Sequence, residues 1–395
     1  MKSIPLLLVL PLATGLFAAD GAAARASAPQ KPAAVSYLIT NDDLPVKVGV
    51  DAGTIFTIAS GGQLQNPDRI SLGGSGAGGG YFTAARVSVL QSATQSCAFL
   101  SVSGAGEVAA VDINALQNVG DFSASSTDIG VGNGVGLVNN GTYVYASFST
   151  SNTLATFAVM PGCGLNFLGD ISPIGKHLGN VKGMAVHGNT LIVAYGDGSI
   201  ESFNVSAGLP VSNGDLQNAT GYNTDRYPSG VDITQDGHYA VFGDMAITAT
   251  VEVSDISSGK LTKTVLYNVG TAGNSDSIFL SPDQTLLYVA NTGTGQVSAA
   301  FFNASTGKIT RGCASATLKG FDNNWVFLSS PVTELNSGTG SILYVAEFGA
   351  SSGIAVVNVT SSAGKCTLTE SAGSPVVDPN STNLLSIGVY PPRQF

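Results

Sequence analysis

Charged residues are scarce in this chain, where Asp, Glu, Lys and Arg make up 11% of 395 residues, against about 25% in an average globular domain. The 16 Lys and Arg residues form no cluster, and 26 acidic residues outnumber them, which gives a formal net charge of −10. Because a protein that binds nucleic acid must neutralise phosphates with a basic surface, this composition argues against nucleic acid as a partner.

Cysteine is also rare, and the sequence contains no C-x-x-C pair, no H-E-x-x-H motif and no Asp-x-Asp-x-Asp calcium loop. The motifs that would indicate a zinc, redox or calcium site are therefore missing, and we expect no metal and no cofactor. The four cysteines are Cys97, Cys163, Cys313 and Cys366. An even number in an exported chain favours disulfides, and all three possible connectivities remain open.

Long apolar runs are absent except at the start of the chain, where residues 4–19 lie between Lys2 and Asp20. This run is shorter than the roughly 20 residues that a transmembrane helix needs, and Ala-rich sequence follows it, as in a secretory signal peptide. We predict that residues 1–28 are a signal peptide and processing region, cleaved after Ala24, Ala26 or Ala28. Residues 34–395 are then a single domain that is secreted, extracellular or in the cell wall, monomeric and without a membrane span.

Glycine and short apolar segments are abundant instead, with 50 Gly and 44% hydrophobic residues, a composition that suits short strands joined by tight turns. The chain also contains six N-x-S/T sequons without proline in the middle position. With an export signal, these predict N-linked glycans in a eukaryotic host. The sequons begin at Asn140, Asn204, Asn218, Asn303, Asn358 and Asn380.

A repeated unit sets the expected fold. It consists of an apolar strand, a turn, a second apolar strand, a loop rich in Gly, Asn and Asp, and an alternating strand followed by a turn, and its clearest copy spans residues 277–310. Seven copies can be aligned, and four of the six intervals between them are 44 to 48 residues, close to the length of about 40–50 residues of known propeller blades.

We therefore predict an all-β, seven-bladed β-propeller with four-stranded antiparallel blades. The aligned second strands contain Thr40, Val102, Ala146, Ala194, Phe242, Ala290 and Ala346. The first copy has little sequence before its second strand, whereas residues 383–390 look like a displaced inner strand. We predict that this C-terminal strand completes the first blade, which would close the ring without a free inner edge.

The segments PDQTLLYVAN and STGKITRGC and the ending SIGVYPPRQF resemble fungal secreted proteins of the lactonase-like propeller family, which includes relatives of 3-carboxy-cis,cis-muconate cyclase and 6-phosphogluconolactonase. The resemblance covers residues 34–395. It implies a lactone hydrolase or cyclase that acts on a small carboxylated or sugar-derived ligand. The alternative is a secreted or cell-wall glycoprotein without enzymatic activity, with a role in adhesion or as an antigen.

The family's catalytic pattern, P-R-x-x-x-F-x-P-x-G followed by Y-V-x-N-E, is not matched. Its Arg position falls on Ser229 in one blade and on Asp276 in the next, and its Glu position falls on Met245 and Thr292. This chain therefore lacks the family's catalytic Arg and Glu at the aligned positions. Hydrolysis of a lactone would need other side chains from the same loops.

In a propeller, the loop before each inner strand and the loop after each second strand lie on one face, around the channel mouth. Acids combined with Arg and Lys there could bind a polyhydroxy or carboxylated ligand, and a histidine could act as general base. The same residues could be ordinary capping and turn residues. The catalytic candidates are Arg226, His177 and Glu347, and the ligand-binding candidates are Asp225, Asp276, Lys182 and Asn291. His187 and His238 are expected in turns on the opposite face.

Overall fold

The computed structural model describes residues 35–393, except for 44–49, 77–84, 125–134, 149–150, 173–180, 218–227, 271–272, 293, 321–325, 329–332, 335–339, 348–352, 363, 379–380, 382–383 and 385. The described residues belong to one compact unit that spans 35–395. No helix in the described ranges is long and apolar enough to cross a membrane.

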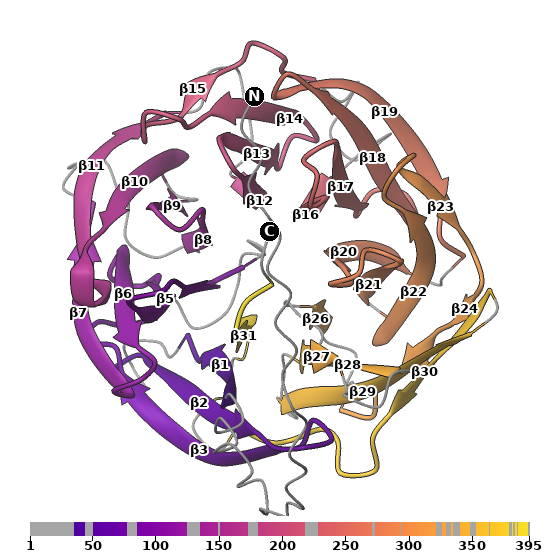
Figure 1. Ribbon diagram of the computed structural model, residues 1–395, viewed down its shortest axis with the longest axis horizontal. Coiled ribbons are helices and arrows are strands. Elements are labelled where there is room, and N and C mark those ends of the chain that lie inside the picture. Colours follow the sequence, from indigo (N-terminus) through magenta and orange to yellow (C-terminus); the bar gives the residue numbers. More distant parts are fainter. Residues whose placement is uncertain are drawn as a thin grey trace, which may run out of the picture. The chain divides into compact units, whose positions relative to one another are not determined.

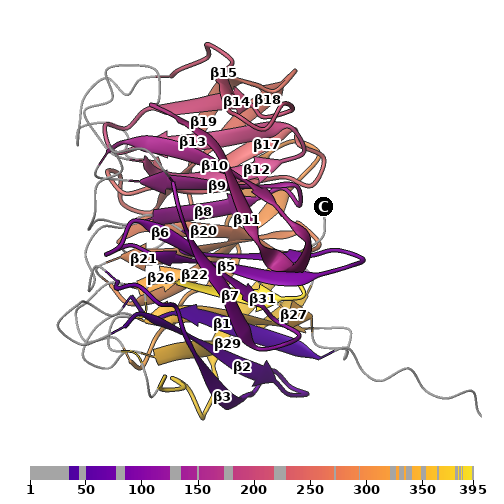
Figure 2. The same ribbon diagram turned by 90° about the vertical axis from the view of Figure 1, so that its left-hand side faces the viewer.

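Seven sheets, each with four main antiparallel strands, surround a central channel, as Figures 1 and 2 show from the face and from the side. From the inner to the outer strand, blade 1 contains β31 (Ser386–Tyr390), β1 (Ser36–Asn41), β2 (Ala52–Ile58) and β3 (Leu64–Ser71). Blade 2 contains β4 (Val87–Gln91), β5 (Ser96–Val102), β6 (Glu107–Asp112) and β7 (Gln117–Ser123). Blade 3 contains β8 (Val135–Asn139), β9 (Tyr143–Phe148), β10 (Thr153–Val159) and β11 (Leu165–Ile171), with the short 3₁₀ helix η1 (Pro161–Cys163) between the last two.

The remaining blades follow the same order. Blade 4 contains β12 (Val181–His187), β13 (Thr190–Tyr195), β14 (Ile200–Asn204) and β15 (Val211–Ser212). Blade 5 contains β16 (Pro228–Ile233), β17 (Tyr239–Asp244), β18 (Thr250–Ser257) and β19 (Lys260–Asn268). Blade 6 contains β20 (Asn274–Leu280), β21 (Leu286–Thr292), β22 (Gln296–Asn303) and β23 (Lys308–Thr310), with β25 (Ala316–Thr317) beside β22. Blade 7 contains β26 (Val326–Leu328), β28 (Gly340–Glu347), β29 (Gly353–Ser362) and β30 (Lys365–Glu370), with β24 (Cys313–Ala314) and β27 (Thr333–Glu334) at its margins.

The predicted ring closure is confirmed. Strand β31 pairs antiparallel with β1 from Tyr37↔Tyr390 to Asn41↔Ser386, so the C-terminal strand is the inner strand of the blade that the N-terminal strands complete. Figure 1 shows the indigo β1 beside the yellow β31. The two ends of the propeller are therefore held together by backbone hydrogen bonds rather than by side chains alone.

The hydrophobic core lies between the blades. Second strands are apolar on both faces because each blade packs against two neighbours, and β5, for example, is buried along its whole length. The outer strand β7 of the same blade alternates instead between exposed and half-buried residues. In the described part of the chain, the buried apolar side chains form seven clusters, each shared by two adjacent blades. Burial of apolar surface between blades is therefore the main stabilising contribution.

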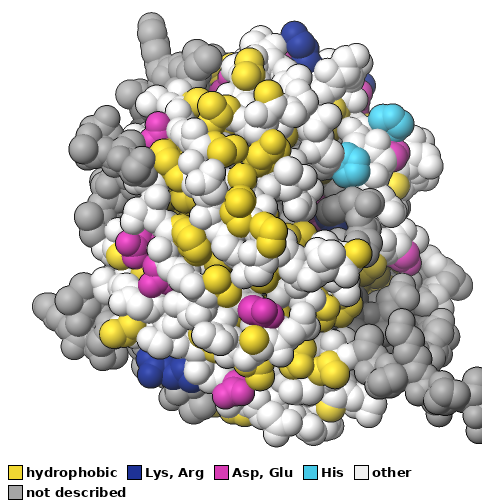
Figure 3. Space-filling model, turned by 60° about the vertical axis from the view of Figure 1, so that its left-hand side comes forward, with side chains coloured by type: hydrophobic (Ala, Val, Ile, Leu, Met, Phe, Trp, Pro, Cys, Tyr) yellow, Lys and Arg dark blue, Asp and Glu magenta, His cyan; other side chains and the backbone are white. Residues whose placement is uncertain are grey.

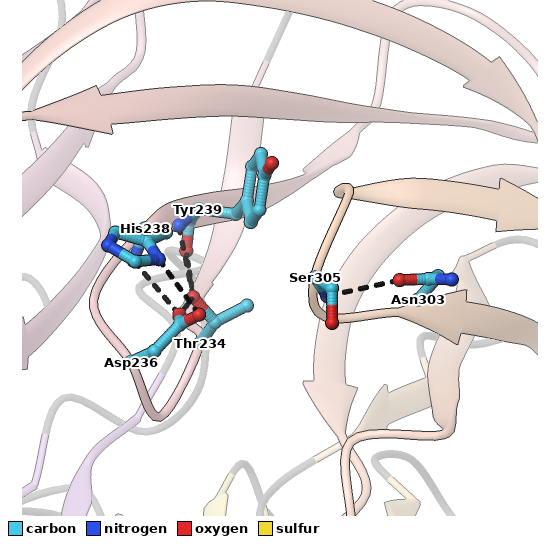
Figure 4. A network of polar contacts seen from close by, with 6 residues as sticks. All are labelled: Thr234, Asp236, His238, Tyr239, Asn303 and Ser305. Carbon is cyan, nitrogen blue, oxygen red and sulfur yellow. Dashed lines mark hydrogen bonds and ion pairs between the residues drawn. The ribbon is translucent and has the colours of Figure 1, made fainter.

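The turns between inner and second strands repeat one hydrogen-bonded arrangement in blades 5 and 6. In blade 5, the Thr234 hydroxyl donates to Asp236 (2.6 Å) and accepts from the Tyr239 N–H (3.0 Å), as Figure 4 shows. In blade 6, the Ser281 hydroxyl donates to Asp283 (2.6 Å) and accepts from the Leu286 N–H (2.9 Å). A short hydroxyl residue two positions before Asp thus satisfies the turn locally.

The structure gives the pairing of the four cysteines, which the sequence left open. Cys97 of β5 pairs with Cys163 of η1 and joins blade 2 to blade 3, while Cys313 of β24 pairs with Cys366 of β30 in blade 7. Such bonds persist in oxidising compartments.

Candidate functional site

The channel has two chemically different ends. All inner strands begin at one end, which we call the upper mouth, where the second strands also end. They finish at the lower mouth, where short turns lead into the second strands. The candidate residues predicted from the sequence belong to the upper mouth by their positions: Lys182 and Asp276 lie near the starts of β12 and β20, and Asn291 and Glu347 lie near or at the ends of β21 and β28.

Three consecutive blades carry a β-bulge at the upper mouth. Pairing with the second strand skips Lys182 in β12, Ser229 and Gly230 in β16, and Asp276 in β20. A bulge frees a residue from the ladder and redirects its side chain, and bulges are common beside functional sites. The equivalent bulge position, directly before the residue at which pairing resumes, is thus occupied by Lys182 in blade 4, Gly230 in blade 5 and Asp276 in blade 6.

The three bulges approach one another closely. A Cβ atom at Gly183 would lie 1.8 Å from the Ser229 carbonyl oxygen, and one at Gly230 would lie 2.8 Å from the Asp276 carbonyl oxygen. The Ser229 hydroxyl donates to the same Asp276 carbonyl at 2.5 Å. Glycine at 183 and 230 is therefore required for backbone contact between the inner strands of blades 4, 5 and 6.

Lys182 and Asp276 are both buried, with exposed fractions of 6% and 3%. Burial lowers the pKa of Lys182 below the ordinary lysine value, and the negative charge of Asp276 counteracts part of that lowering. Desolvation strengthens the electrostatic field that such charges exert on a ligand. Of the predicted set, Lys182 and Asp276 are thus two residues between which an electrostatic interaction is indicated.

The other predicted residues are placed differently. The amide of Asn291 donates to the hydroxyl of Ser298 (2.7 Å) on the neighbouring strand β22, a contact between two strands of blade 6. Glu347 is buried in blade 7, where a Cβ at Gly320 would lie 2.1 Å from its Oε2. His177, Asp225 and Arg226 lie outside the described residues.

Sequence reasoning missed a buried carboxyl pair in the connection that closes the ring. The Thr40 hydroxyl lies 2.8 Å from Asp42 Oδ1 and 3.1 Å from Asp378 Oδ2, and the Thr54 hydroxyl lies 3.2 Å from Asp378 Oδ1. Burial, followed by the charge of Asp378, raises the pKa of Asp42 to about 8. Asp378 precedes β31 in an irregular segment, and no sequence pattern marks it as a partner of Asp42.

A second missed group is Arg86, which precedes β4 and is 1% exposed. Its guanidinium donates to Asp43 Oδ2 at 2.6 Å, and the Ser103 hydroxyl donates to Asp43 Oδ1 at 2.5 Å. The rule that polar residues before inner strands line the upper mouth would have selected Arg86. Its ion pair with Asp43 links blades 1 and 2.

Behind the lower mouth lies a cavity of about 530 Å³, lined by the inner strands of blades 1 to 6 together with Pro392 and Arg393. His187 ends β12 at this mouth, and His238 directly precedes β17, so both histidines lie on the face opposite Lys182, as expected. Burial lowers the pKa of His187. Figure 3 shows histidine side chains, in cyan, at the edge of a hollow in the surface.

Within the described ranges, no three His, Cys, Asp or Glu residues are arranged to hold a metal ion.

Comparison with known proteins gives the fold. No family model matches the chain, and no curated protein matches it in sequence. Among solved structures, it is similar to a candidate 6-phosphogluconolactonase from Bacteroides fragilis (14% identity, 89% of this chain and 98% of that one, TM-score 0.63) and to another from Bacteroides uniformis (13%, 90% and 99%, 0.65). It is also similar to the periplasmic gluconolactonase of Pseudomonas aeruginosa (14%, 87% and 98%, 0.62).

Proposed function

We propose that this protein is a lactone hydrolase acting on a small carboxylated or sugar-derived lactone at the upper mouth of the propeller. The observation that carries this proposal is the row of bulges in three consecutive blades, of which the first and the third free the buried charged residues Lys182 and Asp276 from strand pairing. The lactonase-like fold shared with the gluconolactonase from Pseudomonas aeruginosa supports the substrate class.

The chemistry follows from these groups. Water adds to the lactone carbonyl, its proton passes to a carboxylate, the ring C–O bond breaks, and the ring oxygen takes up a proton to give a hydroxy acid. A buried ammonium group stabilises negative charge on the carbonyl oxygen, which is the role proposed for Lys182. Asp276 is proposed as the base that accepts the proton from water.

The remaining candidates complete this proposal. Arg226 and Asp225 belong to residues 218–227, directly before β16, and His177 belongs to residues 173–180, directly before β12. Arg226 is proposed to bind the carboxylate of the substrate because its guanidinium can form two parallel hydrogen bonds to that group. His177 and Glu347 are proposed as further proton-transfer groups, and Asp225 and Asn291 as groups that bind ligand hydroxyls.

A panel of lactones tests the proposal. The purified protein is assayed by acid release in a pH-stat with D-gluconolactone, 6-phosphogluconolactone and a carboxylated γ-lactone. The expected result is saturable hydrolysis of at least one of them, above the rate without enzyme. Absence of turnover and of binding across the panel would favour the alternative, a glycoprotein that acts in adhesion or as an antigen.

The substitution Arg226→Ala is expected to lower affinity or turnover for the best substrate at least tenfold, which corresponds to about 1.4 kcal/mol. Stability should change by less than about 1 kcal/mol if the side chain is at the rim. Kinetics and thermal unfolding of the variant measure both quantities. Unchanged kinetics beside an active wild type would remove Arg226 from the site.

We also propose that the protein is exported and N-glycosylated. Asn204 and Asn303 are exposed, and their side-chain oxygens accept the N–H of Ser206 (2.9 Å) and Ser305 (3.0 Å), as Figure 4 shows for Asn303. The amide of Asn358 instead donates to Ser371 (2.8 Å).

In a fungal secretion host, at least three of the six sequons should therefore carry glycan, with Asn204 and Asn303 among them. Enzymatic deglycosylation that converts the modified Asn to Asp, read by peptide mass, identifies the occupied sites. Unchanged masses at all six would contradict this prediction.

A further inference from the structure

Side chains join neighbouring blades around the lower mouth. Amide and hydroxyl groups link blade 1 to 2, blade 2 to 3 and blade 3 to 4, and a carboxylate links blade 5 to 6. These contacts are Gln91–Tyr390 (3.2 Å), Asn139–Ser88 (2.8 Å), Asn140 to the Gly188 carbonyl (3.2 Å), and the Leu280 N–H to Asp232 (2.8 Å). Around the lower mouth, these polar groups thus form hydrogen bonds from one blade to the next.

The C-terminal residues cross this mouth. They leave β31 in blade 1, yet the Arg393 guanidinium donates to both oxygens of Asp232 in blade 5, at 3.0 and 2.5 Å. It also donates to the Leu280 carbonyl oxygen in blade 6 (2.9 Å) and lies 4.9 Å from the centroid of the Phe279 ring. Because blade 1 borders neither blade 5 nor blade 6, the tail must span the channel to make these contacts.

The carboxylate of Asp232 anchors the C-terminal tail and accepts hydrogen bonds from several groups. The Asp232 carboxylate accepts the N–H groups of Ile233 and Leu280 at 2.8 Å each, in addition to the two guanidinium bonds. The Asp232 and Arg393 side chains are each 10% exposed. A carboxylate this buried needs a cation, and a forked guanidinium contact supplies it with fixed geometry.

We propose that residues 391–393 form a strap across the lower mouth, so that solutes pass between the cavity and solvent at this end only when the anchor at Asp232 opens. The inference rests on the contacts of Arg393 and does not depend on lactone hydrolysis. If the channel also holds the proposed site, ligands enter from the upper mouth.

Cysteine accessibility tests the strap directly. All four native cysteines are in disulfides, so one added cysteine is the sole thiol. Ala185 lines the cavity and is 9% exposed, whereas Ala207 is on the open surface. With the strap intact, N-ethylmaleimide should label the Ala185→Cys variant at least tenfold more slowly than the Ala207→Cys variant. Adding Arg393→Ala should speed labelling of the Ala185→Cys variant at least tenfold and leave that of the Ala207→Cys variant unchanged.

Labelling of a cysteine at a third position distinguishes opening of the strap from unfolding of the protein. Ala290 is fully buried in the core between blades 6 and 7 and does not line the cavity, so the Ala290→Cys variant should remain unlabelled with and without Arg393→Ala. If it becomes labelled, Arg393→Lys, which keeps the positive charge near Asp232 but loses the fork, replaces Arg393→Ala in the comparison. Fast labelling of the Ala185→Cys variant with the strap intact, or no acceleration while Ala290→Cys stays protected, would overturn the proposal.

Discussion

The substitution Lys182→Met is expected to lower kcat/KM for the best lactone substrate at least 100-fold, about 2.7 kcal/mol of transition-state stabilisation. Met keeps about the length and the apolar stem of the buried Lys182 but cannot stabilise an oxyanion. Steady-state kinetics on the purified variant measure the effect, and the loss should fall mainly on kcat because the charge on the carbonyl oxygen develops in the transition state.

Two controls separate this loss from unfolding and from a general loss of positive charge. The same change at the exposed Lys260 of β19 removes one positive charge without touching the upper mouth, so Lys260→Met should leave kinetics unchanged. Because Lys182→Met removes one member of a buried, oppositely charged pair, it is expected to lower the free energy of unfolding by about 3–5 kcal/mol. Thermal unfolding of the variant therefore sets the assay temperature, at which both proteins must be folded. Full activity in Lys182→Met would exclude the proposed role.

The stability of the wild-type protein is expected to fall as pH rises toward about 8, and Asp42→Asn should remove much of this dependence. Burial first, then the charges of Asp378 and Asp51, raises the pKa of Asp42 from 3.8 to about 8, against a lowering effect of the Thr40 hydroxyl. The folded state therefore binds a proton that the unfolded state releases. This contribution to stability is fully present below the unfolded pKa near 3.8 and is lost as pH rises through about 8.

Asparagine imitates the protonated carboxyl group of Asp42, so the variant should match the wild type at pH 5 and exceed it at pH 8.5, by about 5 °C in Tm or more. Differential scanning calorimetry across this range provides the comparison. The matched control is Asp68→Asn at an exposed position of β3, which should leave the pH profile unchanged. Parallel profiles for the wild type and Asp42→Asn would show that the carboxyl pair does not retain a proton.

Seven blades and their closure could be predicted because each depends on a repeated local pattern. The copy around residues 277–310 contains a turn, two apolar strands and a glycine-rich loop, and the same pattern recurs at nearly constant spacing. The first copy lacked an inner strand and the C-terminus offered a spare one, so β31 could be assigned to blade 1. Closure follows from counting strands, which requires no knowledge of side-chain packing.

The details of the site could be predicted only in part. The positions of Lys182, Asp276 and Glu347 in loops before inner strands or after second strands were enough to place them at one mouth. The bulges that redirect Lys182 and Asp276 were not predictable, because a bulge depends on register against the next strand rather than on local sequence. The Asp42–Asp378 pair and the Arg393–Asp232 anchor each join residues more than 150 positions apart, and no motif marks such partners.

The most direct test of the central claim is a crystal structure of the protein with the hydroxy acid product of its best lactone substrate. The account predicts one bound molecule at the upper mouth, with its carboxylate or hydroxyl groups in hydrogen-bond distance of Lys182 and Asp276. A product molecule found only in the cavity near His187 and Arg393, or no bound product at a concentration that inhibits turnover, would contradict it.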